Sequence, residues 1–264
     1  MNPVPVAVAA LFGSLYGSFL NVVIFRLPEG ESVVSPRSRC PHCGKPIGAL
    51  DNLPVLSWLV LRGRGRCCGK PISARYPLVE AAVAALTGGL WHRWGGVSPL
   101  FAAGAALACG ALVAVALIDW DTFLIPDELS LGLALSGLLF APFNPYFDAG
   151  PHAAWWSAPW LCVRGAAFGF GLGWALAVGG EALFKKDALG GGDVKLLAGV
   201  GAWAGCTGAF DCLMIGSLLG SIYGVRLLLA GKATRSDAIP FGPFLAAAAI
   251  VGFYRLLPFG WPLV

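Results

Sequence analysis

Charged residues are scarce in this chain. They make up 12% of its 264 residues, hydrophobic residues make up 57%, and the mean hydropathy is +0.74. Soluble globular domains carry about 25% charged residues, so this composition excludes a soluble domain. A basic segment is also lacking before the first apolar run, at residues 4–25. This absence argues against a cleavable signal peptide, and we expect a retained helix there.

What the sequence does contain is one apolar run after another. A membrane-spanning helix needs roughly 20 mainly apolar residues, and short polar or Gly/Pro-rich pieces separate the runs. The 37 glycines suit a membrane bundle because small residues let helices approach closely. The sequence therefore predicts an all-α polytopic membrane protein with about eight transmembrane helices, at residues 4–25, 77–92, 98–117, 128–145, 159–184, 194–208, 210–230 and 239–257.

Basic residues indicate how the helices are oriented. Nine of the eighteen lysines and arginines lie between Arg26 and Arg75, against three acidic residues. The positive-inside rule makes this segment cytoplasmic, and topology then explains its charge without nucleic-acid binding. An even number of helices places both termini on the opposite side. We expect three parts: a first transmembrane helix (1–25), a cytoplasmic cysteine-containing loop domain (26–76) and a seven-helix membrane domain (77–264).

Two acidic motifs reach the cytoplasmic ends of predicted helices: IDWDTFLIPD at 118–127 and GGGDVK at 190–195. Placing a carboxylate at the edge of the hydrocarbon costs free energy, so we expect such a residue to have a function. Gly190 and Gly192 free the backbone before Asp193, which could also act simply as a helix cap. Asp119 ends an apolar helical run, where the helix dipole disfavours an anion. It therefore lacks a purely structural explanation.

Two carboxyl groups held close together would share a proton, because both cannot ionise easily. The charged member can accept a proton from water, and the neutral member can donate one to a carbonyl. This is the chemistry of aspartic peptide hydrolysis, which needs no metal. A proton-coupled transporter is an alternative, but it predicts internal repeats, and the halves show no convincing repeat. A non-catalytic assembly factor is a third reading, and it would tolerate Asp119→Asn.

Six ordered segments carry a family resemblance: GSFLNVVIFRLP at 17–28, CPHC at 40–43, CGKPIS with RYPLVE at 68–80, IDWDTFLIPD at 118–127, GGGDVK at 190–195 and IPFGPFL at 239–245. The chain resembles the type IV prepilin leader peptidases, which are bacterial inner-membrane aspartic proteases of the Gly-X-Gly-Asp class. The resemblance implies that Asp119 and Asp193 are the catalytic pair, and that the termini are periplasmic.

The resemblance also implies the substrates. They are precursors of type IV pilins or of type II secretion pseudopilins, whose basic leader is removed after a glycine at the cytoplasmic face. Many members of the family also methylate the new amino terminus with S-adenosylmethionine. In the family, a Gly-Lys pair before a cysteine is associated with methylation, and the matching residues here are Gly63 and Arg64.

Four cysteines lie in the cytoplasmic segment. Cys40 and Cys43 form a CxxC pair, whereas Cys67 and Cys68 are adjacent. Two CxxC pairs at this separation indicate zinc, and a reducing cytoplasm favours a metal over a disulfide. The family pattern would place a cysteine at position 65, where this chain has glycine. We expect these four cysteines to form a structural zinc site, with His42 or water as an alternative fourth ligand and a metal-free loop as the other reading.

Further residues could support the site. Glu80, in the RYPLVE segment, could line it or pair with Arg75. Lys195 could stabilise a charged Asp193, or lie at the membrane interface. Pro240 and Gly242 interrupt the start of the last helix. That start could receive the extended segment of the substrate, or serve only as a helix entry.

Overall fold

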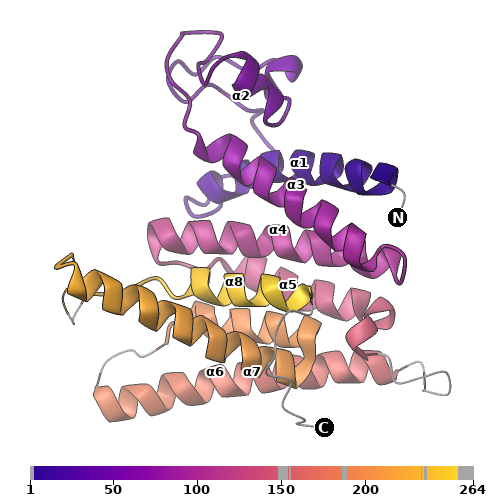
Figure 1. Ribbon diagram of the computed structural model, residues 1–264. Helices are drawn as coiled ribbons and strands as arrows, with labels where there is room; N and C mark the ends of the chain where they lie inside the picture. The colour runs from indigo at the N-terminus through magenta and orange to yellow at the C-terminus, as the bar shows by residue number, and fades with distance from the viewer. Residues whose placement is uncertain are drawn as a thin grey trace. The chain divides into compact units, whose positions relative to one another are not determined.

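The computed structural model describes residues 3–147, 154, 156–185, 189–232, 234 and 237–254. Over these residues the chain is mostly helical and forms isolated bridges instead of strands. The α-helices are α1 (Pro3–Arg26), α2 (Leu56–Val60), α3 (Arg75–Trp94), α4 (Pro99–Thr122), α5 (Asp127–Phe140), α6 (Ser157–Phe184), α7 (Gly191–Leu229) and α8 (Gly242–Phe253) (Figure 1). Short 3₁₀ helices occur at Ala49–Asn52 (η1), Ala141–Phe143 (η2) and Pro145–Phe147 (η3).

The predicted helices form close to their expected positions, and two differences concern the site. Residues 191–229 run as one element, interrupted at Gly205, which has φ 71° and ψ −170°. Glycine tolerates this backbone conformation, so the break falls a few residues before the predicted one. The last helix is also shorter than expected, because α8 starts at Gly242. Residues 255–257 of that prediction lie outside the described residues.

Among the residues that the structure describes, four helices are long and apolar enough to cross a membrane: α1, α4, α6 and α7. The shorter α8 is also apolar. The composition and these helices together make the chain a membrane protein. The expectation of about eight spans remains a prediction.

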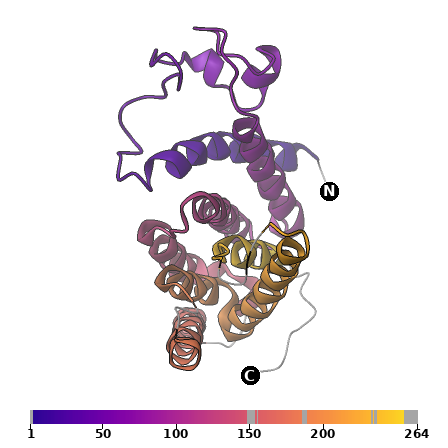
Figure 2. The same cartoon turned by 90° about the vertical axis from the view of Figure 1, so that its left-hand side faces the viewer.

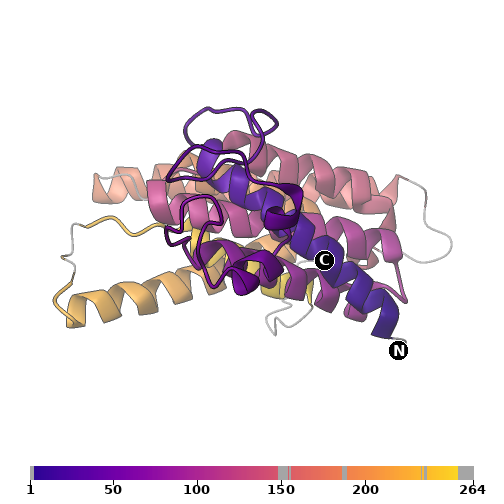
Figure 3. The same ribbon diagram turned by 90° about the horizontal axis from the view of Figure 1, so that it is seen from above.

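Contacts divide the chain into two compact units, residues 1–110 (unit 1) and 111–264 (unit 2). In unit 1, α1 packs across α3 (Figure 1). Glycines make this close approach possible, since a Cβ at Gly13 would lie 2.6 Å from the Thr87 Oγ1 of α3, and one at Gly17 would lie 2.8 Å from the Glu80 Cα. The cysteine-containing segment, residues 27–74, folds at the ends of α1 and α3 that carry Arg26 and Arg75 (Figure 3).

Unit 2 is built around the first half of α7. Gly165 of α6 and Gly201 of α7 touch backbone to backbone, which leaves no space for a Cβ on either. The fully buried Trp203 donates its indole N–H to the Leu133 carbonyl of α5 (3.0 Å), and its ring packs against Phe253 of α8. Figure 2 shows α8 packed alongside α7. These contacts hold the first half of α7 against α5, α6 and the end of α8.

Candidate active site and metal centre

Asp119 lies in the last turn of α4 and is buried, with 5% of its surface exposed. The backbone N–H of Gly242, the first residue of α8, donates to its Oδ2 at 2.9 Å. Glycine fits at position 242 without displacing its neighbours, whereas a Cβ there would lie 2.8 Å from the same oxygen. The backbone N–H from α8 therefore offsets the unfavourable interaction between the Asp119 carboxylate and the C-terminal end of α4.

Asp193 is the third residue of α7 and is also buried, with 9% exposed. Gly190 lies against its carboxyl group, since a Cβ on Gly190 would lie 3.2 Å from Asp193 Oδ2. The Oδ1 of Asp193 has no hydrogen-bond partner among the described residues. A buried, unpartnered carboxylate oxygen costs free energy, so it indicates a position at which a substrate group or a water molecule binds.

Ile125 joins the segments that carry the two aspartates. A Cβ at Gly192 would lie 2.8 Å from the Ile125 Cβ, and one at Gly242 would lie 3.1 Å from its Cδ1. The Asp119 and Asp193 carboxyl groups are close enough to interact electrostatically. The structure thus brings the two predicted residues together in unit 2. Such a pair can hold one proton between its members and can both accept and donate protons.

Lys195 does not contact Asp193. Its Nζ lies 2.7 Å from Oδ1 of Asp127, at the start of α5, and the two side chains are 39% and 56% exposed. The ion pair therefore links the two acidic motifs at their surface and contributes little stability. Pro240 lies two residues before the start of α8 and is half-buried. Its role in receiving the substrate stays a prediction.

Glu80 lies in unit 1, where 8% of it is exposed. Its Oε2 accepts the backbone N–H of Val55 at 2.7 Å. Val55 has φ 60° and immediately precedes α2. This conformation is unfavourable for a β-branched residue, and the carboxylate holds it in place. The structure therefore gives Glu80 a role in shaping the cysteine-containing segment.

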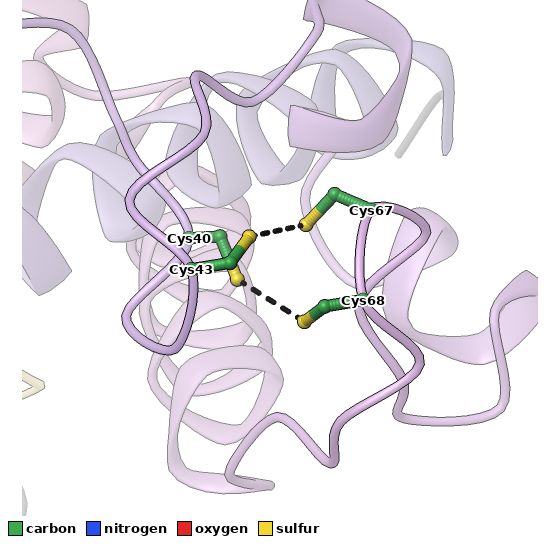
Figure 4. A group of neighbouring side chains, drawn as sticks. All are labelled: Cys40, Cys43, Cys67 and Cys68. Carbon is green, nitrogen blue, oxygen red and sulfur yellow. Dashed lines mark hydrogen bonds between the residues drawn. The ribbon is translucent and has the colours of Figure 1, made fainter.

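The four cysteines of that segment converge, although they come from two separate turns (Figure 4). Their sulfur atoms all lie within 4.8 Å of one another; Cys43 and Cys67 are 3.3 Å apart, and Cys40 and Cys68 are 3.7 Å apart. Four thiolates around tetrahedral zinc, with bonds of about 2.3 Å, stand roughly 3.8 Å apart. The arrangement fits a zinc ion. His42 is directed elsewhere, with its Nε2 2.9 Å from the Pro71 carbonyl oxygen.

The two turns have the same backbone hydrogen bonds. The Cys40 N–H donates to the carbonyl oxygen of Lys45, and the Gly65 N–H donates to the carbonyl oxygen of Lys70, each at 2.9 Å. Gly65 therefore occupies the place that Cys40 occupies in the first turn. A Cβ at Gly65 would lie 3.8 Å from the Cys40 sulfur and 3.7 Å from the Cys68 sulfur. Cys67 supplies the sulfur that a cysteine at 65 would otherwise provide, so the departure from the family pattern does not empty the cluster.

The cysteines differ in acidity. Backbone N–H groups of His42 and Cys43 lower the pKa of the Cys40 thiol to about 6. Hydrogen bonds with Cys43 and Cys40 raise the pKa of Cys67 to about 12. Zinc is held by thiolates, and the turn that begins at Cys40 already favours one.

Gly63 and Arg64, the residues associated with methylation through the resemblance, lie in the second turn. Gly63 has φ +68°, and a Cβ on it would lie 2.9 Å from the Trp58 ring. Arg64 lines a cavity of about 820 Å³ in unit 1 together with Trp58 and Glu80. Sequence reasoning missed Trp58 and Ile125. Ile125 falls inside the IDWDTFLIPD motif, whose apolar residues drew no attention beside its three aspartates.

Comparisons with known proteins match two family models to two different parts of the chain, and the boundary between these parts lies close to the boundary between units 1 and 2. The Bacterial Peptidase A24 N-terminal domain matches residues 11–94, and the Type IV leader peptidase family matches residues 106–225. A relative from Aeromonas hydrophila, called a prepilin leader peptidase/N-methyltransferase, is 40% identical across 94% of this chain and 88% of its own length. Relatives of the same name from Stutzerimonas stutzeri and from Burkholderia pseudomallei (strain 1026b) are 37% and 35% identical, covering 95% and 96% of this chain and 91% and 86% of their own lengths. No solved structure matches.

Proposed function

Because the chain belongs to the type IV leader peptidase family, we propose that it is a prepilin leader peptidase that also N-methylates its product. Its substrates are precursors of type IV pilins or of type II secretion pseudopilins. The enzyme removes their basic leader after a glycine. Nothing found in the comparisons supports the alternative of a proton-coupled transporter.

The observation that carries the peptidase assignment is the pairing of Asp119 and Asp193 inside unit 2. The Gly242 N–H orients one carboxyl group, and the other has a buried oxygen that finds no hydrogen-bond partner in the described part of the chain. One carboxylate takes a proton from the attacking water, and the protonated partner donates a proton to the scissile carbonyl. The low dielectric around them strengthens both interactions with the substrate.

The methylation assignment rests on the names of the relatives. S-adenosylmethionine, when bound, would supply the methyl group that the amine of the new amino terminus accepts, and Trp58, Arg64 and Glu80 would line its site. The cavity in unit 1 fits a ligand of this kind, because it combines aromatic, acidic and basic walls in a volume typical of cofactor sites.

The cysteine cluster binds zinc in this proposal, through Cys40, Cys43, Cys67 and Cys68. The metal is structural: it ties the two turns together and takes no part in hydrolysis. A structural site of four protein thiolates leaves no open coordination position for water or substrate.

In this proposal the chain lies in the bacterial inner membrane with about eight spans. The cysteine-containing segment and the aspartate pair face the cytoplasm, and both termini are periplasmic. The basic residues between Arg26 and Arg75 support this orientation. A site at the cytoplasmic face suits a substrate that is cut just outside its own apolar helix.

The experiment that tests the function is cleavage of a type IV prepilin by purified protein in detergent or lipid, with and without S-adenosylmethionine, read by mass spectrometry. The wild type should release the leader and, with the methyl donor, add the mass of one methyl group. Asp119→Asn and Asp193→Asn should each slow cleavage by roughly 100- to 10,000-fold while remaining folded. Normal cleavage by both variants would remove the aspartates from the mechanism.

A further inference from the structure

Unit 2 contains a groove of about 780 Å³ between two long helices. The second half of α6 and the second half of α7 form its walls, and the chain around the start of α8 completes it. These two helices diverge toward their last residues (Figure 1). The lining residues that the structure describes are aliphatic, phenylalanine, glycine and serine residues, none of them ionisable. We propose that this groove binds the apolar segment of the prepilin that follows the scissile bond, which rests on the proposed peptidase function.

The groove reaches the chain segments that hold the two aspartates. Leu189 lines the groove and lies immediately before the GGGDVK motif. Phe241 also lines it and immediately precedes Gly242, the residue whose N–H binds Asp119. A substrate whose peptide bond lies at the aspartates can therefore continue directly into the groove.

The α7 wall of the groove runs past the aspartate site. A Cβ on Gly216 would lie 2.9 Å from Leu245 Cδ2, and one on Gly224 would lie 3.0 Å from Ile239 Cδ1. Leu245 and Ile239 lie on either side of the α8 start, so this half of α7 passes alongside the residue that holds one carboxyl group. The α7 residues that line the groove fall between positions 213 and 228. They extend over about 22 Å of helix at a rise of ~1.5 Å per residue, enough to follow several turns of a bound segment.

The walls suit an apolar polypeptide. A charged ligand would find no ionic partner among the described lining residues, and its burial would cost free energy. Gly179 of α6 lines the groove, and a Cβ on it would have no described atom within 4 Å beyond its chain neighbours and the nearby backbone of its own helix. Small residues let a second helix approach closely, which an acyl chain does not require. Ser217 and Ser221 also line the groove, where their hydroxyl groups can bind backbone groups freed as the substrate unwinds.

The groove also gives a role to the apolar residues of the IPFGPFL stretch. Ile239, Phe241 and Phe244 all line it, whereas Gly242, which lies among them in the sequence, donates its N–H to Asp119. One short segment therefore contacts a carboxyl group of the aspartate pair and offers apolar side chains to the substrate. In this arrangement the segment positions the substrate relative to the aspartates.

Gly179→Leu tests the proposal by filling the groove. The assay is cleavage of a full-length type IV prepilin by the full-length protein in lipid nanodiscs. The leucine should raise KM roughly 5- to 150-fold, the effect of overpacking a close contact. It should change kcat less than about twofold, because lost substrate binding acts on KM and the aspartates are untouched.

Gly171→Leu is the matched control for this variant. Gly171 lies on the same helix, its Cβ position is equally open, and it lies outside the groove. Gly171→Leu should cleave prepilin with the KM of the wild type. Equal KM values for the two variants would overturn the proposal.

Photo-cross-linking gives a second measurement, which does not depend on the folding of Gly179→Leu. The photoreactive amino acid p-benzoylphenylalanine is introduced at Val225, which lines the groove and is 54% exposed, or at Ile222, which is 57% exposed on the same helix but outside the groove. The proposal predicts an adduct with prepilin, or with its cleaved product, at Val225 and not at Ile222. Equal adducts at both positions would overturn it. Adducts with phospholipid alone at Val225 would also overturn it and make the groove a lipid site.

Prepilin cleavage by the wild type is followed in parallel and separates the two proposals. If prepilin cross-links at Val225 but the wild type does not cleave it, the peptidase function fails while the groove assignment stands. If the wild type cleaves prepilin but neither glycine variant changes KM and the two cross-linking positions behave alike, the groove assignment fails while the peptidase function stands.

Discussion

Gly242→Ala tests the geometry of the aspartate site with the smallest possible change. The added methyl group would lie 2.8 Å from Asp119 Oδ2 and 3.1 Å from Ile125 Cδ1. Overpacking of this kind costs about 1–3 kcal/mol. If the carboxyl group moves away, it loses the 2.9 Å hydrogen bond from the Gly242 N–H, and hydrogen bonds to charged groups contribute about 1.5–3 kcal/mol. Because relief of one penalty incurs the other, we expect one loss of this size and not their sum.

A loss of about 1.5–3 kcal/mol in the transition state corresponds to a roughly 10- to 150-fold lower kcat/KM for prepilin cleavage. The loss should appear in kcat, because Asp119 acts in the chemical step. The assay is a cleavage time course on purified protein, with circular dichroism to show that the helices remain. Gly132→Ala in α5 is the control, since its Cβ position has no described atom within 4 Å beyond its chain neighbours and the nearby backbone of its own helix. Wild-type kcat in Gly242→Ala, or an equal loss in the control, would refute the reasoning.

Three further outcomes follow from the structure. Cys67→Ser should release zinc to a competing chelator, and Gly65→Cys in the same chain should restore retention, as metal analysis of the dialysed protein will show; retention by Cys67→Ser alone would contradict a role for Cys67. Lys195→Met should change cleavage less than about threefold, because its pair with Asp127 is exposed, and a loss above tenfold would contradict this. Gly165→Ala should lower the thermal midpoint in detergent, because a Cβ there meets the α7 backbone, so an unchanged midpoint would argue against that close packing.

Much of the fold could be predicted from hydropathy alone, because each long helix must present an apolar surface to lipid. The start of α8 and the position of the break in α7 could not. Gly205 lies among other glycines and alanines, and nothing local distinguishes it from them. A Cβ on Gly205 would lie 3.4 Å from the Phe147 ring, a contact with a residue 58 positions earlier that the local sequence does not report.

The aspartates could be predicted because a carboxylate at the end of an apolar helix has few structural explanations. Their partners could not. The hydrogen bond from Gly242 to Asp119 joins residues 123 positions apart, and no periodicity reports such a contact. Sequence spacing also makes adjacent Cys67 and Cys68 resemble a damaged motif. The structure resolves this because the second turn repeats the backbone of the first, with Gly65 in place of a ligand.

Asp119 and Asp193 act as one catalytic unit in the proposed mechanism, and a double-mutant cycle on kcat measures whether their contributions are coupled. Each of Asp119→Asn and Asp193→Asn should lower kcat for prepilin cleavage by roughly 100- to 10,000-fold, the usual effect of losing an acid or base. The measurement is kcat for the variant that carries both substitutions. Residues that act as a unit are strongly non-additive, so the double variant should be no slower than the slower single variant. If the two losses multiply instead, the carboxyl groups act independently, and the shared site is wrong.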